Sequence, residues 1–225
     1  MKTLILIALI LYLPTIVIGQ TDQNSKIIFN KSLATQLDSI YFNDQEIRLR
    51  LDSMEKIYNW QSPEMQTLLK KMDYQDSINL ICVKSILDKY GWLGANEVGK
   101  QGNNTLFLVI QHADHLTQEK YLPIMREAVK KGIASSNALA LLEDRVALDE
   151  GRKQIYGSQV FMYSDTNKYS VRPLEDPDSV DKRRAEVGLQ PIALYLDRWG
   201  ITWNVEQYKK ELPAIEAKEK AMRHQ

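Results

Sequence analysis

The 225-residue sequence has almost no cysteine and no excess of charge of either sign. Cys82 is its only cysteine, so an internal disulfide is excluded. Its neighbours Ile81, Val83 and Ile86 are apolar, which favours a buried, unreactive thiol over a nucleophile. Basic and acidic side chains number 29 each, so the formal net charge is zero. A neutral chain lacks the electrostatic footprint of a nucleic-acid-binding protein, and we expect no nucleic-acid partner.

Long apolar runs are also scarce, and the one that stands out lies at the N-terminus. Met1 and Lys2 are followed by an apolar stretch over 4–18, then by Gly19 and polar residues. This order is typical of a secretory signal peptide, and we predict residues 1–19 as that peptide. An uncleaved anchor is disfavoured, because the run is shorter than the ~20 apolar residues of a membrane span. We therefore expect an exported protein, periplasmic or extracellular, with no membrane contact after cleavage.

The rest of the chain repeats apolar residues at steps of three and four, the periodicity of amphipathic helices. This pattern predicts a mainly α-helical fold. A single domain is expected over 20–203, with its core over about 40–198. A charged, solvated helical tail follows over 204–225. The predicted helices cover approximately residues 26–59, 63–90, 105–114, 117–131, 136–151, 178–188 and 191–200.

Two segments depart from the helical pattern. Residues 159–163 and 168–172 favour β-structure, and the Ser, Asp, Thr and Asn between them are typical turn residues. We predict one small β-hairpin before the C-terminal helices. Residues 94–104 are rich in glycine and asparagine and are expected to form a loop.

The segment over 94–101 nearly matches a phosphate-binding P-loop. Gln101 stands where that loop needs a serine or threonine to hold Mg²⁺. The segment also follows a predicted helix, whereas a P-loop follows a buried strand. We expect no nucleotide and no other cofactor.

His112, Asp114 and His115 are side chains of the metal-binding kind. On a helix, His112 and Asp114 would project about 160° apart and could not bind one ion. His112 and His115 could do so, but a site needs a third ligand from elsewhere. We therefore expect no metal. The alternative roles are a hydrogen-bonded core histidine for His112 and an N-cap for Asp114.

A charged pair interrupts the apolar stripe of the first predicted helix. Asp44 stands between Ile40 and Ile47, where an apolar residue is expected, and Arg48 follows four residues later. An ordinary surface ion pair contributes little. The position on the apolar face argues for a pair that is at least partly buried.

Arg145 repeats this theme on a later helix. Leu141 and Leu148 flank it at helical spacing, so its stem should be buried. A buried guanidinium needs a carboxylate or several carbonyls, and Asp44 or Asp114 could supply one. We predict that Arg145 lies close to Asp44, Arg48 and His112, beside the segment over 154–159 that leads into the hairpin.

Short motifs recur along the chain in a specific order. They are Asp44-Gln45 with Arg48, Gly91-Trp92, Gln111-His112-Ala113-Asp114, Leu122-Pro123, Glu143-Asp144-Arg145-Val146, Gly151, Gln154, Tyr156-Gly157-Ser158-Gln159, Arg183-Arg184 and Gly188-Leu189. This set resembles the DUF6624 family, a bacterial domain of unknown function, although Ser158 stands where the family more often has threonine. The resemblance covers about 40–198 and implies one recurring constellation of polar residues, but no reaction.

That constellation supports two hypotheses. The first is a binding or interaction module for a small ligand or a protein, with a polar network of Asp44, Arg48, Gln111, Gln154, Tyr156, Gln159 and Arg183. The second is a hydrolase-type enzyme. In it, His112 acts as general base or acid beside Asp44 or Asp114, and Arg145 or Arg48 holds an anionic substrate. An open pocket that contains His112 and an arginine would favour a functional site over a structural network.

Overall fold

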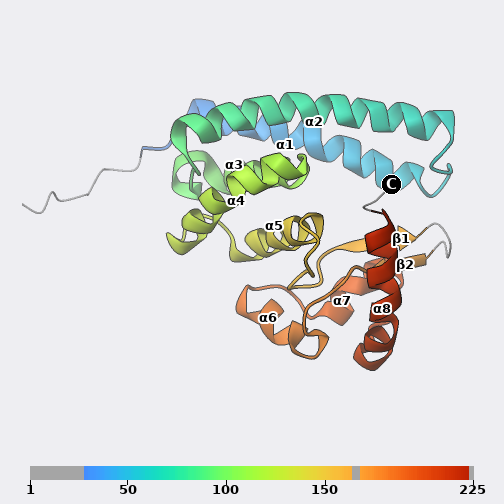
Figure 1. Ribbon diagram of the computed structural model, residues 1–225. Helices are drawn as coiled ribbons and strands as arrows, with labels where there is room; N and C mark the ends of the chain where they lie inside the picture. Colours follow the sequence, from blue (N-terminus) through green and yellow to red (C-terminus); the bar gives the residue numbers. More distant parts are fainter. Residues whose placement is uncertain (1–27, 164–167, 223–225) are drawn as a thin grey trace, which may run out of the picture.

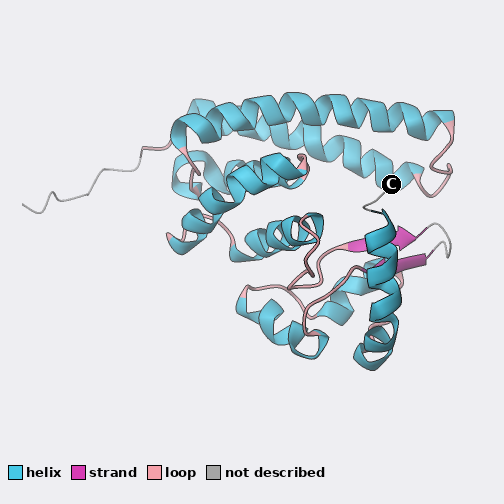
Figure 2. Ribbon diagram, viewed as in Figure 1, coloured by secondary structure: helices cyan, strands magenta, loops and turns pink. Residues whose placement is uncertain are grey.

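The computed structural model describes residues 28–163 and 168–222. The predicted signal peptide and the predicted turn over 164–167 lie outside these ranges. The described fold is mainly helical with one hairpin, which confirms the predicted fold class (Figure 2). Its elements are α1 (Lys31–Met54), α2 (Pro63–Tyr90), α3 (Ala95–Gln111), α4 (His115–Lys130), α5 (Ser136–Asp149), β1 (Val160–Tyr163), β2 (Lys168–Val171), η1 (Pro177–Ser179), α6 (Val180–Glu186), α7 (Ile192–Leu196), η2 (Asp197–Trp199) and α8 (Val205–Met222).

The first five helices form the larger part of the molecule. The long helices α1 and α2 lie side by side, α3 packs against both of them, and α4 packs against α5 (Figure 1). Capping residues fix where these helices begin. The side chains of Asn30, Ser62 and Asp114 accept hydrogen bonds from the first turns of α1, α2 and α4. The core between the helices includes the fully buried side chains of Leu37, Val83, Leu106, Ile110, Tyr121, Met125 and Leu142.

A second, smaller core lies below α5 in Figure 1, where the hairpin and the C-terminal helices meet. The strands β1 and β2 are antiparallel, with Val160 opposite Val171. The buried side chains around them include Leu174, Ile192 and Leu196. In Figure 1, α5 lies between the α1–α2 layer and the helices α6 and α7.

The C-terminal tail is helical, as predicted, but it is solvated only on one side. Tyr208 and Ile215 of α8 are buried in the smaller core. The Tyr208 hydroxyl accepts a hydrogen bond from the backbone N–H of Leu174. Arg172, directly after β2, donates two hydrogen bonds to Glu219, which is buried. The high charge of the tail concealed the apolar side of an amphipathic helix.

The prediction of a loop over 94–104 is wrong, because α3 begins at Ala95. The Glu97 carboxylate accepts a hydrogen bond from the Gly94 N–H and so caps the helix start. Gly99 interrupts the helix with a φ of 79°. At Gly102 a Cβ atom would lie 3.1 Å from Val98 of the same helix and 3.3 Å from Leu37 of α1, so the position is crowded from both sides. Tertiary packing thus outweighs the poor helix propensity of this segment.

The end of α3 also differs from its prediction. The helix stops at Gln111, so His112 and Asp114 belong to the connection to α4. The predicted helix over 178–188 begins with a 3₁₀ turn and ends at Glu186. Within the described residues, no helix combines the length and the apolar character that a membrane span requires.

Candidate functional site

The centre of the candidate site is a pair of side chains, Asp44 of α1 and His112 at the end of α3. His112 Nδ1 lies 3.1 Å from Asp44 Oδ1. The Asp44 side chain is 2% exposed and that of His112 is 21% exposed. The carboxylate is therefore buried behind an imidazole that reaches solvent.

Arg48 ties this pair to α2. Its guanidinium donates two hydrogen bonds to Asp76, at 3.1 and 2.9 Å. It also lies 3.1 Å from Asp44 Oδ1 and donates to the Asp44 carbonyl. Gln45 donates to the other oxygen of Asp44. Because its donors already bind Asp44 and Asp76, Arg48 is not available as a clamp for an anionic substrate.

These contacts decide the charge of Asp44. Burial acts to raise its pKa, but the hydrogen bond and charge of His112, the charge of Arg48 and the hydrogen bond from Gln45 together lower the pKa below its usual value. An ionised carboxylate only accepts hydrogen bonds, so His112 Nδ1 carries the proton in this pair. In a neutral His112, the free lone pair therefore belongs to Nε2.

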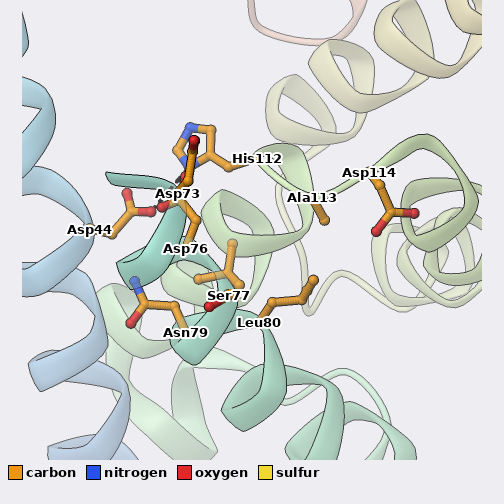
Figure 3. Close-up of a pocket in the computed structure, with 10 residues that line it drawn as sticks. Asp44, Asp73, Asp76, Ser77, Asn79, Leu80, His112, Ala113 and Asp114 are labelled. Atoms are coloured by element: carbon orange, nitrogen blue, oxygen red, sulfur yellow. Dashed lines mark hydrogen bonds and ion pairs between the residues drawn. The ribbon is translucent and has the colours of Figure 1, made fainter. Parts of the chain in front are cut away.

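A cavity of about 260 Å³ lies beside this pair, between α1, α2 and the turn from α3 to α4. Figure 3 shows Asp44, Asp73, Asp76 and His112 at one end of it and Asp114 at the other, beyond Ala113. Within the part of the chain that the structure describes, the Asp73 side chain makes no hydrogen bond or ion pair. Its charge is thus available to a ligand.

Asn79 of α2 forms the floor of the same cavity and is 1% exposed. Its Oδ1 accepts a hydrogen bond from Gln75. Its Nδ2 has no partner among residues 28–163 and 168–222. A buried amide without an acceptor is costly, so this donor favours an acceptor atom in the cavity.

Asp114 acts as the N-cap of α4, the alternative that the sequence left open. Its carboxylate accepts hydrogen bonds from the N–H and the hydroxyl of Thr117, which lower its pKa. The predicted 160° divergence from His112 does not hold, since both residues follow the end of α3 and line one cavity. Among the described residues, no group of three or more His, Cys, Asp or Glu side chains is placed to hold a metal ion.

The predicted partners of Arg145 are wrong. Asp44 and Asp114 are bonded elsewhere, and no hydrogen bond or ion pair joins Arg145 to either of them. The buried Arg145 Nε has no acceptor within the described ranges. Burial lowers the pKa of Arg145, the charge of Asp149 opposes this, and the charges of Arg172 and Arg48 add to it. Arg145 is not among the residues that line the acidic cavity.

The segment over 154–159 is held by the protein itself rather than by a ligand. The fully buried Gln154 amide donates to the carbonyls of Gln159 and Arg172 and accepts from the Gln159 N–H. Arg183 donates to the carbonyl of Ile155, and Arg184 donates to that of Tyr156. These residues position the hairpin and do not line the cavity.

Sequence reasoning missed the acid at the centre of that segment. Asp144 of α5 accepts hydrogen bonds from the N–H groups of Ile155, Tyr156 and Ser158, at 2.6 to 2.9 Å. Burial raises the pKa of Asp144, against the effect of these bonds. The available signal was its place next to Arg145, within a helix that has apolar residues on either side of Glu143, Asp144 and Arg145.

Gln111 was predicted as a site residue but does not line the cavity, whereas polar residues of α2 line it and were not predicted. Gln111 is buried, its carbonyl accepts from Gln118, and its Oε1 has no partner among the described residues. Asp73, Asp76 and Asn79 were not singled out, because acids and amides on a long charged helix resemble an ordinary solvated face.

Comparison with known proteins places the chain in a family. Residues 32–203 match DUF6624, described as a family of unknown function, and the chain belongs to it. This confirms the resemblance seen in the ordered motifs. No curated protein and no solved structure shows a significant match.

Proposed function

We propose that this DUF6624 protein is an exported ligand-binding domain, and that its cavity takes a small organic cation such as a primary amine. The observation that carries the proposal is the set of four carboxylates, Asp44, Asp73, Asp76 and Asp114, around one cavity of about 260 Å³. Asp73 in particular has no partner among the described residues.

The charge balance of the cavity supports this ligand class. The positive charge of Arg48 is shared between Asp44 and Asp76, and His112 bonds to Asp44. One cation therefore cannot neutralise the acids around it. A ligand ammonium group would compensate the remaining charge, which is worth more at a partly desolvated surface than in bulk water.

The floor of the cavity adds a second requirement. Asn79 Nδ2 points toward the acids in Figure 3 and lacks an acceptor among the described residues. A ligand with a hydroxyl or carbonyl oxygen near its amine would satisfy this donor. An amino alcohol meets both requirements. A metal ion meets neither well, because the described acids do not form a metal-ligating group.

Isothermal titration with ethanolamine and 1,4-diaminobutane tests the proposal. We expect Asp73→Asn to weaken binding by about tenfold, which is ~1.4 kcal/mol and within the range of one ion pair near a surface. Asp52→Asn is the matched control, since Asp52 is an exposed acid of α1 outside the cavity. Equal binding by both variants and the wild type, or no binding of either amine, would refute the proposal.

One observation favours a second function, general-base catalysis. Asp44 fixes the proton of His112 on Nδ1, and this leaves Nε2 to take a proton from a ligand or water in the cavity. Hydrolysis of p-nitrophenyl acetate by the wild type and by His112→Gln would test it. Activity that His112→Gln retains in full would exclude this role.

A further inference from the structure

Arg145 is a charged side chain for which the described part of the fold offers little compensation. It lies on α5, and its Nε is buried without an acceptor among the described residues. No ion pair joins its guanidinium to a carboxylate of residues 28–163 or 168–222. An arginine does not lose its proton under physiological conditions, so it cannot escape this cost by becoming neutral.

The acids nearby already have other partners. Asp44 and Asp76 bind Arg48, and Glu219 binds Arg172. Asp149 lies one helical turn after Arg145 and its charge acts on the guanidinium, but no ion pair joins the two among the described residues, and its carboxylate lies 3.8 Å from His115 Nδ1. The protein therefore uses its carboxylates in this region for other cations.

The charges that act on Arg145 are of both signs, because Arg172 and Arg48 oppose the effect of Asp149. The charges of Arg172 and Arg48 both act on its guanidinium. Tyr195 is near as well, and its hydroxyl donates to the Ser158 carbonyl. A buried arginine usually has an acid bonded to it, whereas here Asp149 acts on Arg145 without an ion pair and two arginines oppose its effect.

We infer that Arg145 is the anchor of an anion-binding site, which takes a phosphate, sulfate or carboxylate group between α5, α1 and the hairpin. The guanidinium side chain is only partly buried, so a small anion can reach its outer nitrogens. A planar fork of N–H donors suits two-point contact with such an anion. Arg145 does not line the acidic cavity, so this inference stands apart from the proposed function.

Calorimetric and thermal titrations with phosphate, sulfate and acetate test the inference, with sodium chloride at matched ionic strength as reference. We expect wild-type protein to bind at least one of the anions saturably. Arg145→Met should lose about tenfold or more in affinity, and Arg145→Lys about threefold, because lysine keeps the charge but not the fork. Comparing the three anions separates a phosphate or sulfate site from a carboxylate site.

Arg126→Met is the matched control, since Arg126 is an exposed arginine that pairs with Glu143 on the surface. It should bind like the wild type. Arg145→Met should also melt no lower than the wild type in anion-free buffer, because it removes a partly buried charge that has no ion-pair partner and whose Nε has no acceptor among the described residues. Anion affinity that is the same in the wild type, Arg145→Lys and Arg145→Met, or absent from all, would overturn the inference. The stabilisation that phosphate and sulfate give to proteins in general would appear equally in every variant.

Discussion

Asp144→Ala offers the sharpest test of how the fold positions the hairpin. The substitution removes the acceptor of three backbone N–H groups, those of Ile155, Tyr156 and Ser158. Asp144 is fully buried, so water does not readily replace it. A hydrogen bond to a charged group contributes ~1.5 kcal/mol at the low end of the usual range. Three such bonds sum to ~4.5 kcal/mol, and the cost of burying the carboxylate away from water reduces this sum.

The expected loss is about 4 kcal/mol in the free energy of unfolding. In a domain of this size, it corresponds to a melting temperature lower by ~8–16 °C. Urea unfolding followed by circular dichroism gives the free energy, and a thermal melt gives the temperature. The geometry of the acidic cavity beside α1 and α2 should change little, because the hydrogen bonds of Asp144 go to residues 155–158 and not to either helix.

Glu143→Ala is the control for this experiment. Glu143 is the adjacent residue, and its carboxylate accepts from the exposed Arg126. A surface pair of this kind contributes ~0–1 kcal/mol. The free energies of unfolding of Asp144→Ala and Glu143→Ala should differ by more than ~1 kcal/mol, the upper contribution of one surface pair. A smaller difference would refute the role of Asp144 as the anchor of the hairpin.

Two further predictions concern acid stability and export. Because the folded pKa of Asp44 lies below its ordinary value of 3.8, its contribution to stability is complete above that value and is lost as the pH falls through the folded pKa. Asp44→Asn should therefore flatten the loss of stability in acid, as measured by urea unfolding between pH ~2 and ~5, and an unchanged profile would contradict this. For export, mass spectrometry of protein secreted by an expressing cell should find Gln20 at the N-terminus. An intact Met1 on a cytoplasmic species would contradict the proposed signal peptide.

Much of the fold follows from local patterns that can be recognised in the sequence. The periodicity of apolar residues predicted α1, α2, α4 and α5, and the turn chemistry predicted the hairpin. Asp44 drew attention because it interrupts an apolar stripe, and the structure places Arg48 and His112 beside it. A charge in an apolar pattern is a strong signal, since burying it requires partners.

The remaining parts of the site depend on packing that no local pattern reveals. Asp73 and Asp76 lie on a helix that carries many other polar and charged residues, so their place beside His112 depends on how α2 packs against α1 and α3. The glycines of α3 suggested a loop, although Gly102 lies in a helix where Val98 and Leu37 of α1 leave little room for a side chain. For Arg145, burial was inferable, but the partner was not, because the acids of this region bind other cations.

The most direct test of the central claim is a nuclear magnetic resonance titration of the histidine side chains with ethanolamine. His112 lines the acidic cavity, whereas His115 lies just outside it and serves as a control in the same molecule. We predict that the imidazole resonances of His112 shift and saturate, that those of His115 stay nearly constant, and that Asp73→Asn weakens the effect. If His112 does not respond, or if both histidines respond alike, the acidic cavity is not the ligand site.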